Sequence, residues 1–360
     1  MKARCAARLL AAAALLGLVA CAAGGGSPAP AGTAARSAVP PPEAAASAAA
    51  PAGGPATGTA PTPLVVSFSQ ITGNSLALWV AKEAGIFEQN GLAPELQLVE
   101  GNKGIAALLA GETQFADIGG SQTLSAAASG ADLVVLSVAA PVYPFQFMVP
   151  PSISSAADLK GKNVGVSTIG DSSDTATRLA LPALGLEVNT DVTIVPTGSS
   201  RNRVDALVSG ALQGGMSSVP ESLALEAQGF RVLLDLAALG LPAASQSQVS
   251  RRSYVAANHD VAQRYVDSIV EAIALARRDR DLTVEVLKKY YRSTDDQVMG
   301  QTYDYYVGRV IPSLPYPKAE QFKDAQAVLG ASNEQVRQFD LDQLLDPSFV
   351  QSAADRGLDR

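Results

Sequence analysis

A strand–loop–helix pattern that occurs twice is the feature that most limits how this chain can fold. The first series of strands is expected at residues 64–69, 96–99, 115–118 and 133–139, and the second at 164–167, 192–195, 214–217 and 232–236. Gly111 and Gly130 reappear as Gly210 and Gly229, each 99 positions later. Alternating strands and helices imply parallel sheets. The sequence therefore predicts an α/β protein of two matched lobes.

The loops after these strands are rich in Gly, Ser, Thr and Asn. In open α/β sheets, ligands bind beside the carboxyl ends of the strands, where helix N-termini attract acceptor groups. The fullest example is the loop 168–173, in which Gly170 permits a tight turn and a helix follows. Asp171 and Asp174 are interpreted as caps of that helix rather than ligand contacts. Loops 101–104 and 197–200 have the same composition, and two lobes whose loops face each other would form a cleft.

Two extended segments would connect the lobes, at residues 141–150 and 245–255. Two crossings form a hinge rather than a loose tether. The domain boundaries predicted from these segments place lobe 1 at 64–145 and 250–345, lobe 2 at 146–249, and a tail at 346–360.

The first 20 residues are predicted to be a secretory signal peptide. Basic residues precede an apolar run that is too short to span a bilayer. The run ends in Leu18-Val19-Ala20-Cys21, which resembles the lipobox of bacterial lipoproteins and implies lipidation of Cys21. Residues 22–63 contain almost only Ala, Gly, Pro, Ser and Thr, and this predicts a disordered tether. The protein would then be exported and anchored to a membrane by its lipid.

Charge and cysteine content exclude several functional classes. Loss of residues 1–20 removes three basic residues, so the net charge changes from −7 to −10. Such an acidic chain is a poor candidate for nucleic-acid binding. The only cysteines are Cys5 and Cys21, so the mature protein would have no disulfide and no thiol nucleophile in its folded part. No cofactor and no metal site is predicted.

Three segments resemble one known family: residues 78–92 (LWVAKEAGIFEQNGL), 157–181 (ADLKGKNVGVSTIGDSSDTATRLAL) and 229–242 (GFRVLLDLAALGLP). They are similar to the NMT1/THI5-like and SsuA-like substrate-binding proteins of bacterial ABC importers. The resemblance covers about 64–289. It implies a type II periplasmic-binding-protein fold: two α/β lobes, two crossover strands and a cleft that closes on a small solute. Family ligands include sulfonates, taurine, nitrate, pyrimidine precursors of thiamine, and related heterocycles or organic anions.

The family's contact positions fall on the loops described above. They correspond to Ser69, Gln70, Asn74, Ser75, Gly119, Gly120 and Ser121 in lobe 1, and to Thr168, Gly170, Asp171, Ser172, Ser173, Ser217 and Ser218 in lobe 2. Many relatives have Gly-x-x-Asp-Ala where this chain has the segment 210–214 (GALQG), which lacks the acidic residue. The first loop also lacks the aromatic residues and histidine of pyrimidine binders, which argues against a pyrimidine ligand.

The resemblance implies a monomer that delivers a small solute to an ABC permease and its ATPase, without chemistry of its own. Alternatives are an enzyme of the same fold, of the thiamine-pyrimidine or menaquinone type, and a sensory lipoprotein without a transporter. The sole histidine, His259, is expected at a helix start outside the cleft, and Glu221 is the carboxylate to consider as a ligand contact. Arg201 and Arg203 follow a loop of the second lobe and could pair with an anionic ligand, but a surface position is the expectation for both. The tyrosines at 290, 291, 303, 305 and 306 and Trp79 fit helical packing.

Overall fold

The computed structural model describes residues 60–360, which lie in one compact unit, Thr57–Arg360. The predicted signal peptide and Cys21 fall outside the described residues. The first strand, β1 (Thr62–Phe68), already pairs with its neighbour at Thr62. Residues 62 and 63 therefore belong to the sheet and not to the tether assigned to them.

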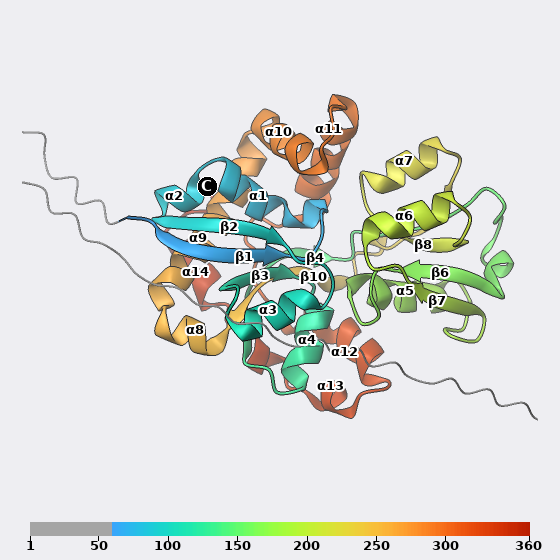
Figure 1. Ribbon diagram of the computed structural model, residues 1–360, viewed down its shortest axis with the longest axis horizontal. Helices are drawn as coiled ribbons and strands as arrows, with labels where there is room; N and C mark the ends of the chain where they lie inside the picture. Colours follow the sequence, from blue (N-terminus) through green and yellow to red (C-terminus); the bar gives the residue numbers. More distant parts are fainter. Residues whose placement is uncertain (1–59) are drawn as a thin grey trace, which may run out of the picture. The chain divides into compact units, whose positions relative to one another are not determined.

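Lobe 1 is built on a five-stranded sheet of order β2-β1-β3-β10-β4 (Figure 1). Its other strands are β2 (Leu92–Leu98), β3 (Phe115–Ile118), β4 (Leu133–Val142) and β10 (Pro242–Arg251). β1 is parallel to β2 and β3, whereas β10 is antiparallel to β3 and β4.

Lobe 2 repeats this arrangement in a second five-stranded sheet, of order β7-β6-β8-β5-β9. Its strands are β5 (Gln146–Val149), β6 (Lys162–Val166), β7 (Val192–Pro196), β8 (Gly214–Ser217) and β9 (Arg231–Asp235). Again one strand, β5, is antiparallel to its neighbours. β3 begins at Phe115 and β8 at Gly214, 99 positions later, which is the offset of the sequence repeat. The predicted two-lobed α/β duplication is confirmed.

Two predicted features of the sheets differ from the structure. β10 starts at Pro242 and pairs with lobe 1, so the boundary set at residue 250 is too late. β4 was expected inside a parallel sheet, but it is an antiparallel edge strand. It is buried because the C-terminal segment covers its edge, with Asp346 N–H donating to the Val135 carbonyl at 3.0 Å. An edge covered in this way has the same apolar sequence as a central strand.

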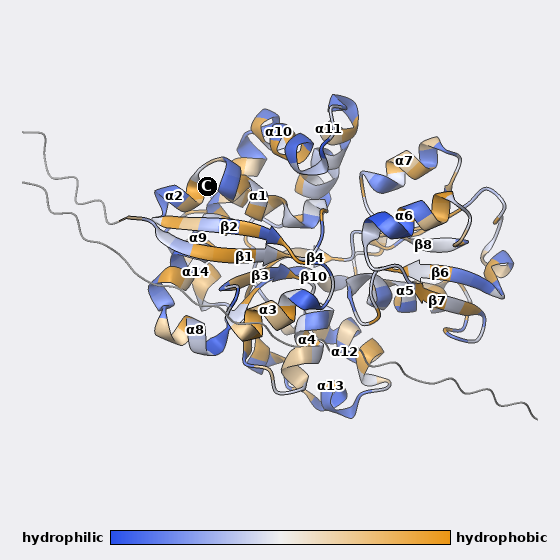
Figure 2. Ribbon diagram, viewed as in Figure 1, coloured by the Kyte–Doolittle hydropathy of each residue, from blue (hydrophilic) through white to orange (hydrophobic). Residues whose placement is uncertain are grey.

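Each lobe carries helices on its sheet, several of them starting at strand-end loops. Lobe 1 has η1 (Gly73–Ser75), α1 (Leu76–Glu83), α2 (Ile86–Gln89), α3 (Lys103–Ala110) and α4 (Gly120–Ala128). Lobe 2 has η2 (Ala156–Leu159), α5 (Ser172–Ala183), α6 (Ser200–Val208), α7 (Glu221–Ala227) and η3 (Ala237–Leu239). In Figure 2, β1 is mainly hydrophobic and α6 mainly hydrophilic, as expected for a covered strand and an outer helix.

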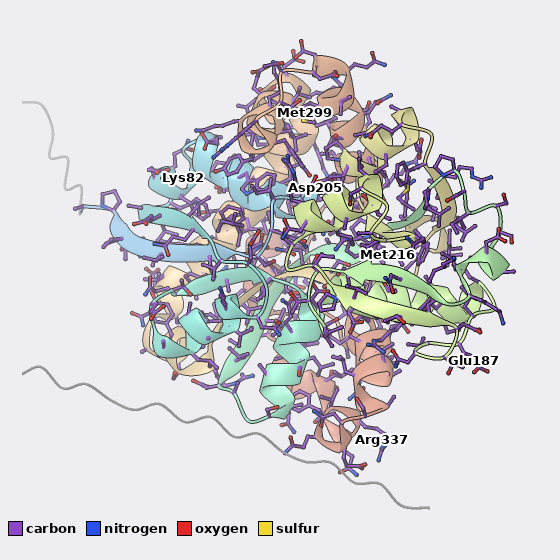
Figure 3. The ribbon with its side chains drawn as sticks, turned by 45° about the vertical axis from the view of Figure 1, so that its right-hand side comes forward. Lys82, Glu187, Asp205, Met216, Met299 and Arg337 are labelled. Carbon is purple, nitrogen blue, oxygen red and sulfur yellow. The ribbon has the colours of Figure 1, made fainter. Side chains whose placement is uncertain are left out.

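The rest of the chain adds helices to lobe 1. These are α8 (Arg252–Ala257), α9 (His259–Arg278), α10 (Arg280–Tyr291), α11 (Asp296–Tyr305), η4 (Tyr306–Val310), η5 (Ala319–Phe322), α12 (Lys323–Gly330), α13 (Glu334–Gln338), η6 (Leu341–Leu344) and α14 (Ser348–Asp355). Figure 3 labels Met299 in this helical layer and Met216 in lobe 2. Among the helices of residues 60–360, none is both long and apolar enough to cross a membrane.

The segment predicted as a tail is part of the lobe 1 core. Phe349, Val350 and Ala353 of α14 are buried. Arg356 donates to Asp267 of α9 through Nη1 at 2.7 Å. The spacing of the three apolar residues puts them on one helix face, and this burial holds α14 against the lobe.

Trp79 lies in the lobe 1 core and is fully buried, as predicted. Its ring stacks on Tyr290 of α10, with centroids 4.5 Å apart, and meets Phe68 edge to face at 6.2 Å. His259 packs against Phe349 at 4.9 Å. These aromatic contacts join the N-terminal strands and helices to the C-terminal helices.

Candidate functional site

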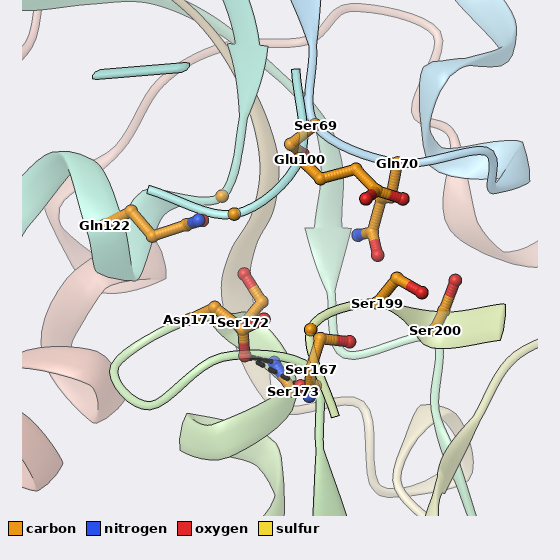
Figure 4. A pocket seen from close by; sticks show the side chains of 13 residues that line it. Ser69, Gln70, Glu100, Gln122, Ser167, Asp171, Ser172, Ser173, Ser199 and Ser200 are labelled. Atoms are coloured by element: carbon orange, nitrogen blue, oxygen red, sulfur yellow. Dashed lines mark hydrogen bonds between the residues drawn. The ribbon is translucent and has the colours of Figure 1, made fainter. Parts of the chain in front are cut away.

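Strand-end loops of the two lobes face each other across one cleft, which we call the narrow cleft (Figure 4). Lobe 1 lines it with Ser69, Gln70, Glu100, Gly101, Gly119 and Gln122, and lobe 2 with Ser167, Asp171, Ser172, Ser173, Gly198, Ser199 and Ser200. Between these loops only about 20 Å³ is wide enough for the centre of a water molecule. The opposed loop faces predicted from the repeat are therefore present.

The lobes touch at one end of the narrow cleft, where α4 and α5 begin. Ser121 Oγ and Thr175 Oγ1 share a hydrogen bond of 2.9 Å between the lobes. Ser172 Oγ donates to the Ser245 carbonyl at 3.4 Å. Gly119 is so close to lobe 2 that an added Cβ would lie 2.4 Å from Ser172 Oγ. A side chain at position 119 would force Ser172 Oγ and the end of Gln122 to turn away, and Ser172 would then lose its hydrogen bond to Ser245.

Asp171 is the cap of α5. Its Oδ1 accepts from Ser173 N at 2.8 Å, Ser173 Oγ at 2.7 Å and Asp174 N at 2.9 Å, and its Oδ2 accepts from Thr168 N at 3.1 Å. Burial raises the pKa of Asp171, and the hydrogen bonds from Ser173 and Asp174 oppose that rise. The N–H groups that would attract an anion at this helix start are thus occupied by its own carboxylate.

Asp174 also has a structural role. Its Oδ2 accepts from Gly170 N at 2.8 Å, and its Oδ1 pairs with Arg178 Nε at 2.9 Å. The prediction that both aspartates cap the helix is confirmed for Asp171, and Asp174 fixes the preceding loop.

Arg203 of α6 is buried beneath the narrow cleft, with 1% of its surface exposed. Nη1 donates to Ser167 Oγ at 2.5 Å, and Nε donates to the Met216 carbonyl. Burial lowers the pKa of Arg203, while the charges of Asp171 and Glu221 raise it. The expectation of a surface position is wrong for Arg203, because its guanidinium joins β6 to β8 inside the lobe.

Arg201 does lie on the surface, with its side chain 85% exposed and within 3.6 Å of Asp205. The two arginines are neighbours on one short helix but face different ways, as positions two apart on a helix do.

Beyond Gln70, Glu100 and Ser200 the cleft continues into a wide chamber of about 310 Å³. Its lining combines charged, aromatic and aliphatic side chains: Gln70, Ile71, Leu98, Glu100, Tyr290, Tyr291 and Arg292 from lobe 1, and Ser200, Arg201 and Glu221 from lobe 2. Burial raises the pKa of Glu221 to about 7, against the opposing charges of Arg203 and Arg201. The wide chamber is the part of the cleft with room for the body of an organic solute.

Fourteen loop residues were predicted to contact ligand, and the structure divides them into groups. Those that line the narrow cleft are Ser69, Gln70, Gly119, Asp171, Ser172 and Ser173. Those buried behind its wall are Asn74, Ser75, Gly120, Ser217 and Ser218. Ser121 forms the interlobe hydrogen bond, Thr168 N–H donates to Asp171, and Gly170 lines a neighbouring groove beside Ile169.

Other lining residues were not among the predicted contacts. Gly101, Gly198, Ser199 and Ser200 belong to loops already marked by composition, and the pairing of β1 and β6 with their neighbours brings these loops into the cleft. Glu100, Gln122, Tyr290, Tyr291 and Arg292 carried no such signal. The tyrosines were interpreted as packing residues. Tyr290 does pack, since its ring stacks on Trp79, but it also lines the wide chamber.

Comparison with known proteins identifies the family. A family model described as NMT1/THI5 like matches residues 72–281. The chain belongs to the NMT1/THI5-like family. No protein of curated function matches the sequence.

Solved structures agree with this membership. The aliphatic sulphonate-binding protein SsuA of Escherichia coli is 24% identical, with a TM-score of 0.64, and the match covers 80% of this chain and 93% of that one. The alkanesulfonate-binding protein SsuA of Xanthomonas axonopodis pv. citri, bound to MOPS, is 25% identical with a TM-score of 0.62, covering 82% and 98%. The desulfurization enzyme DszB is 20% identical with a TM-score of 0.60, covering 81% and 99%.

These matches confirm the predicted fold of this NMT1/THI5-like protein, the two-lobed periplasmic-binding-protein fold. The strand order, with one antiparallel strand entering each sheet from the other lobe, is the crossover arrangement expected for its type II form.

Proposed function

We propose that this protein captures a small organic oxyanion, such as a sulfonate or carboxylate, between its lobes and delivers it to an ABC importer. The observation that carries this proposal is the cleft lined by equivalent strand-end loops of both lobes. A solute that contacts both lobes only when they are together would stabilise the closed arrangement. The structural similarity to two sulfonate-binding proteins supports the choice of solute class.

The wide chamber suits an oxyanion with an organic body. Ser200 and Arg201 form the first turn of α6, and their side chains and Arg292 line the chamber. Cations and the positive end of a helix favour an anionic group there. The rings of Tyr290 and Tyr291, with Ile71 and Leu98, provide apolar surface for the rest of the solute. Nitrate would fill little of this space, so an organic anion is the better candidate.

Binding is tested by a thermal-shift screen of sulfonates, carboxylates, nitrate and pyrimidines on residues 60–360, followed by calorimetry of the hits. Tight binding to the native state raises the melting temperature, by mass action. We expect organic sulfonates or carboxylates to give the largest shifts. A screen in which only neutral heterocycles shift the melting temperature would refute the oxyanion class.

Export and lipid anchoring are part of the same proposal. Cys21 would carry the lipid, and residues 22–61 would link it to the first strand of lobe 1. In cells given a fatty acid with a detectable label, the wild-type protein should incorporate the label and Cys21→Ser should not. Incorporation by the variant would contradict lipidation at this residue.

An enzyme is the competing function, because DszB shares the fold. The sequence of residues 60–360 contains no cysteine, and its single histidine packs against Phe349. We therefore favour reversible binding. The same screen separates the two functions when each hit is recovered and analysed, since conversion of a bound sulfonate to another product would identify an enzyme.

A further inference from the structure

Polar atoms without partners gather where the wide chamber meets the start of α7. Oε2 of Glu221 is shielded from solvent and accepts no hydrogen bond from the described residues. The hydroxyls of Tyr291 and Tyr306 are buried and make no hydrogen bond of standard geometry, although both approach the Gly73 backbone and that of Tyr306 also approaches Ser218. Glu221 and Tyr291 both line the wide chamber, and the charge of Glu221 adds to the rise that burial causes in the pKa of both tyrosines. A buried polar group normally has a partner, and leaving it without one costs stability.

The arginines near Glu221 do not supply the missing hydrogen bond to its Oε2. Arg203 uses its Nη1 on Ser167 and its Nε on the Met216 carbonyl. The side chain of Arg201 is exposed and lies beside Asp205. Within residues 60–360, neither arginine forms an ion pair with Glu221. When ionised, the Glu221 carboxylate accepts hydrogen bonds but cannot donate them, so its missing partner is a donor. The hydroxyls of Tyr291 and Tyr306 are donors but neutral, whereas a cationic donor on the solute would also keep Glu221 ionised.

The wide chamber carries charges of both signs. Glu221 lines it from α7 and Glu100 from the end of β2, while Arg201 and Arg292 line it from α6 and the end of α10. A simple anion would be attracted to the arginines but repelled by the carboxylates. A solute with an acidic group at one end and a basic group at the other would satisfy both.

We propose that Glu221 determines specificity by accepting a hydrogen bond from a protonated amine of the solute, which is therefore a zwitterion rather than a simple organic anion. This inference rests on the proposed function, because it assigns the second end of the same solute. The ring of Tyr291 lies beside the same space, and an aromatic face stabilises a nearby cation. Tyr290 is held in place by its stack on Trp79, so the aromatic wall is ordered before binding.

The test compares pairs of sulfonates that differ only in the proposed group. Taurine and propanesulfonate differ by an ammonium in place of a methyl group, as do aminomethylbenzenesulfonate and ethylbenzenesulfonate. The dissociation constant of each is measured by calorimetry with the wild-type protein at neutral pH. A hydrogen bond to a charged group predicts a preference for the amino member of roughly tenfold to a hundredfold.

Glu221→Gln keeps the shape of the side chain and removes its charge. In this variant the preference should disappear or reverse, because the amine is desolvated without a matching charge. Glu226→Gln is the matched control, since Glu226 lies on the same helix and is exposed. It should keep the wild-type preference. The melting temperatures of both variants show that they fold.

The outcomes separate this inference from the proposed function. Binding of both members of a pair with equal affinity, or a preference that survives in Glu221→Gln, would overturn the role of Glu221 and leave sulfonate capture intact. If neither a sulfonate nor a carboxylate binds, benzylamine is tested alone. Binding that Glu221→Gln abolishes would then support the amine site while the oxyanion class fails, and absence of binding would overturn both.

Discussion

Ser121 Oγ of lobe 1 and Thr175 Oγ1 of lobe 2 lie 2.9 Å apart, each at the start of a helix that faces the other lobe. Both side chains are buried, so this hydrogen bond joins the lobes at a place that water does not reach. It belongs to the arrangement in which the lobes meet, and it should therefore affect binding more than folding.

Loss of this hydrogen bond should weaken solute binding. Ser121→Ala and Thr175→Val each remove one hydroxyl, at a cost of about 1 kcal/mol to the closed arrangement, or roughly fivefold in the dissociation constant. The double variant should lose little more binding free energy than either single variant, because the two hydroxyls form one hydrogen bond with each other. Calorimetry with the best sulfonate measures the effect, and Ser129→Ala at the other end of α4 serves as control. Fully additive losses would contradict the interlobe bond.

Gly119→Ala should weaken the contact between the lobes without unfolding either of them, because Ser172 Oγ must turn away from the new Cβ. The new Cβ would lie 2.4 Å from Ser172 Oγ of the other lobe and 2.6 Å from the flexible end of Gln122. We expect weaker binding by tenfold or more, on the scale of about 1–3 kcal/mol for overpacking, and a nearly unchanged melting temperature. Small-angle scattering with saturating solute should show a larger radius than wild type. Gly308→Ala, where the Cβ meets nothing within 4 Å, is the control.

Replacement of Asp171 should destabilise lobe 2. Its carboxylate accepts four hydrogen bonds from Thr168, Ser173 and Asp174, and an amide in its place can accept fewer and must find acceptors for its own N–H groups. Asp171→Asn should lower the free energy of unfolding by about 1–2 kcal/mol, as loss of a helix cap does. Asp205→Asn on α6, with its side chain 64% exposed, should have almost no effect. Urea denaturation of both variants checks this.

Two buried carboxyl groups should make the solute-free protein more stable in mild acid than in mild base. Burial raises the pKa of Asp117 from 3.8, and that of Glu221 from 4.5, each to about 7. At pH values between the unfolded pKa values of about 4 and the folded value of about 7, the folded state therefore binds more protons than the unfolded state. The stabilisation is complete below the unfolded pKa and is lost as the pH rises through about 7.

The melting temperature of the solute-free protein should fall between about pH 5 and pH 8, with a loss of stability on the order of a few kcal/mol. Asp117 faces Ser75, Gln246 and Gln248, and Gln248 Nε2 donates to it at 2.7 Å. Asp117→Asn carries no charge at any pH, so it should flatten the dependence. A melting temperature that rises over this range would show that the carboxyl groups titrate normally.

Trp79 should report solute binding. It is the only tryptophan, and it stacks on Tyr290, which lines the wide chamber. A solute that contacts Tyr290 should change the emission of Trp79. In Tyr290→Leu this change in emission should be much smaller, whereas the affinity for the solute should fall less. The change in Trp79 emission is measured by titration with a sulfonate whose binding has been shown by calorimetry. An unchanged emission at saturation would place the solute away from this part of the chamber.

The sequence allowed the fold and part of the cleft to be predicted. The 99-residue repeat and the strand-end loops led to two matched lobes, because the order of strands and helices follows from local patterns. The assignment of β10 to lobe 1 did not follow, since Pro242–Arg251 looks like any other strand and its partners are distant in sequence. The cover of β4 by the C-terminal segment was not predicted either, since Asp346 and Val135 are far apart in sequence.

The site residues show the same limit. Gly119 and Asp171 could be found because glycine and a helix cap have local signatures. Glu221 and Tyr291 come from different lobes and meet only through tertiary packing. Arg203 looked like a surface residue, since nothing in its neighbours in sequence indicates that Ser167 and Met216 surround it.

The position of β10 also has a consequence for the order of assembly. The lobe 2 strands form one continuous stretch of chain from Gln146 to Asp235, whereas β4 joins the lobe 1 sheet only through β10. As the chain emerges during synthesis or export, lobe 2 can complete its sheet first, and β4 waits unpaired until Pro242–Arg251 arrives. The middle of the gene thus encodes a sheet that can be complete before that of lobe 1, in which β1, β2 and β3 emerge first but β4 depends on β10.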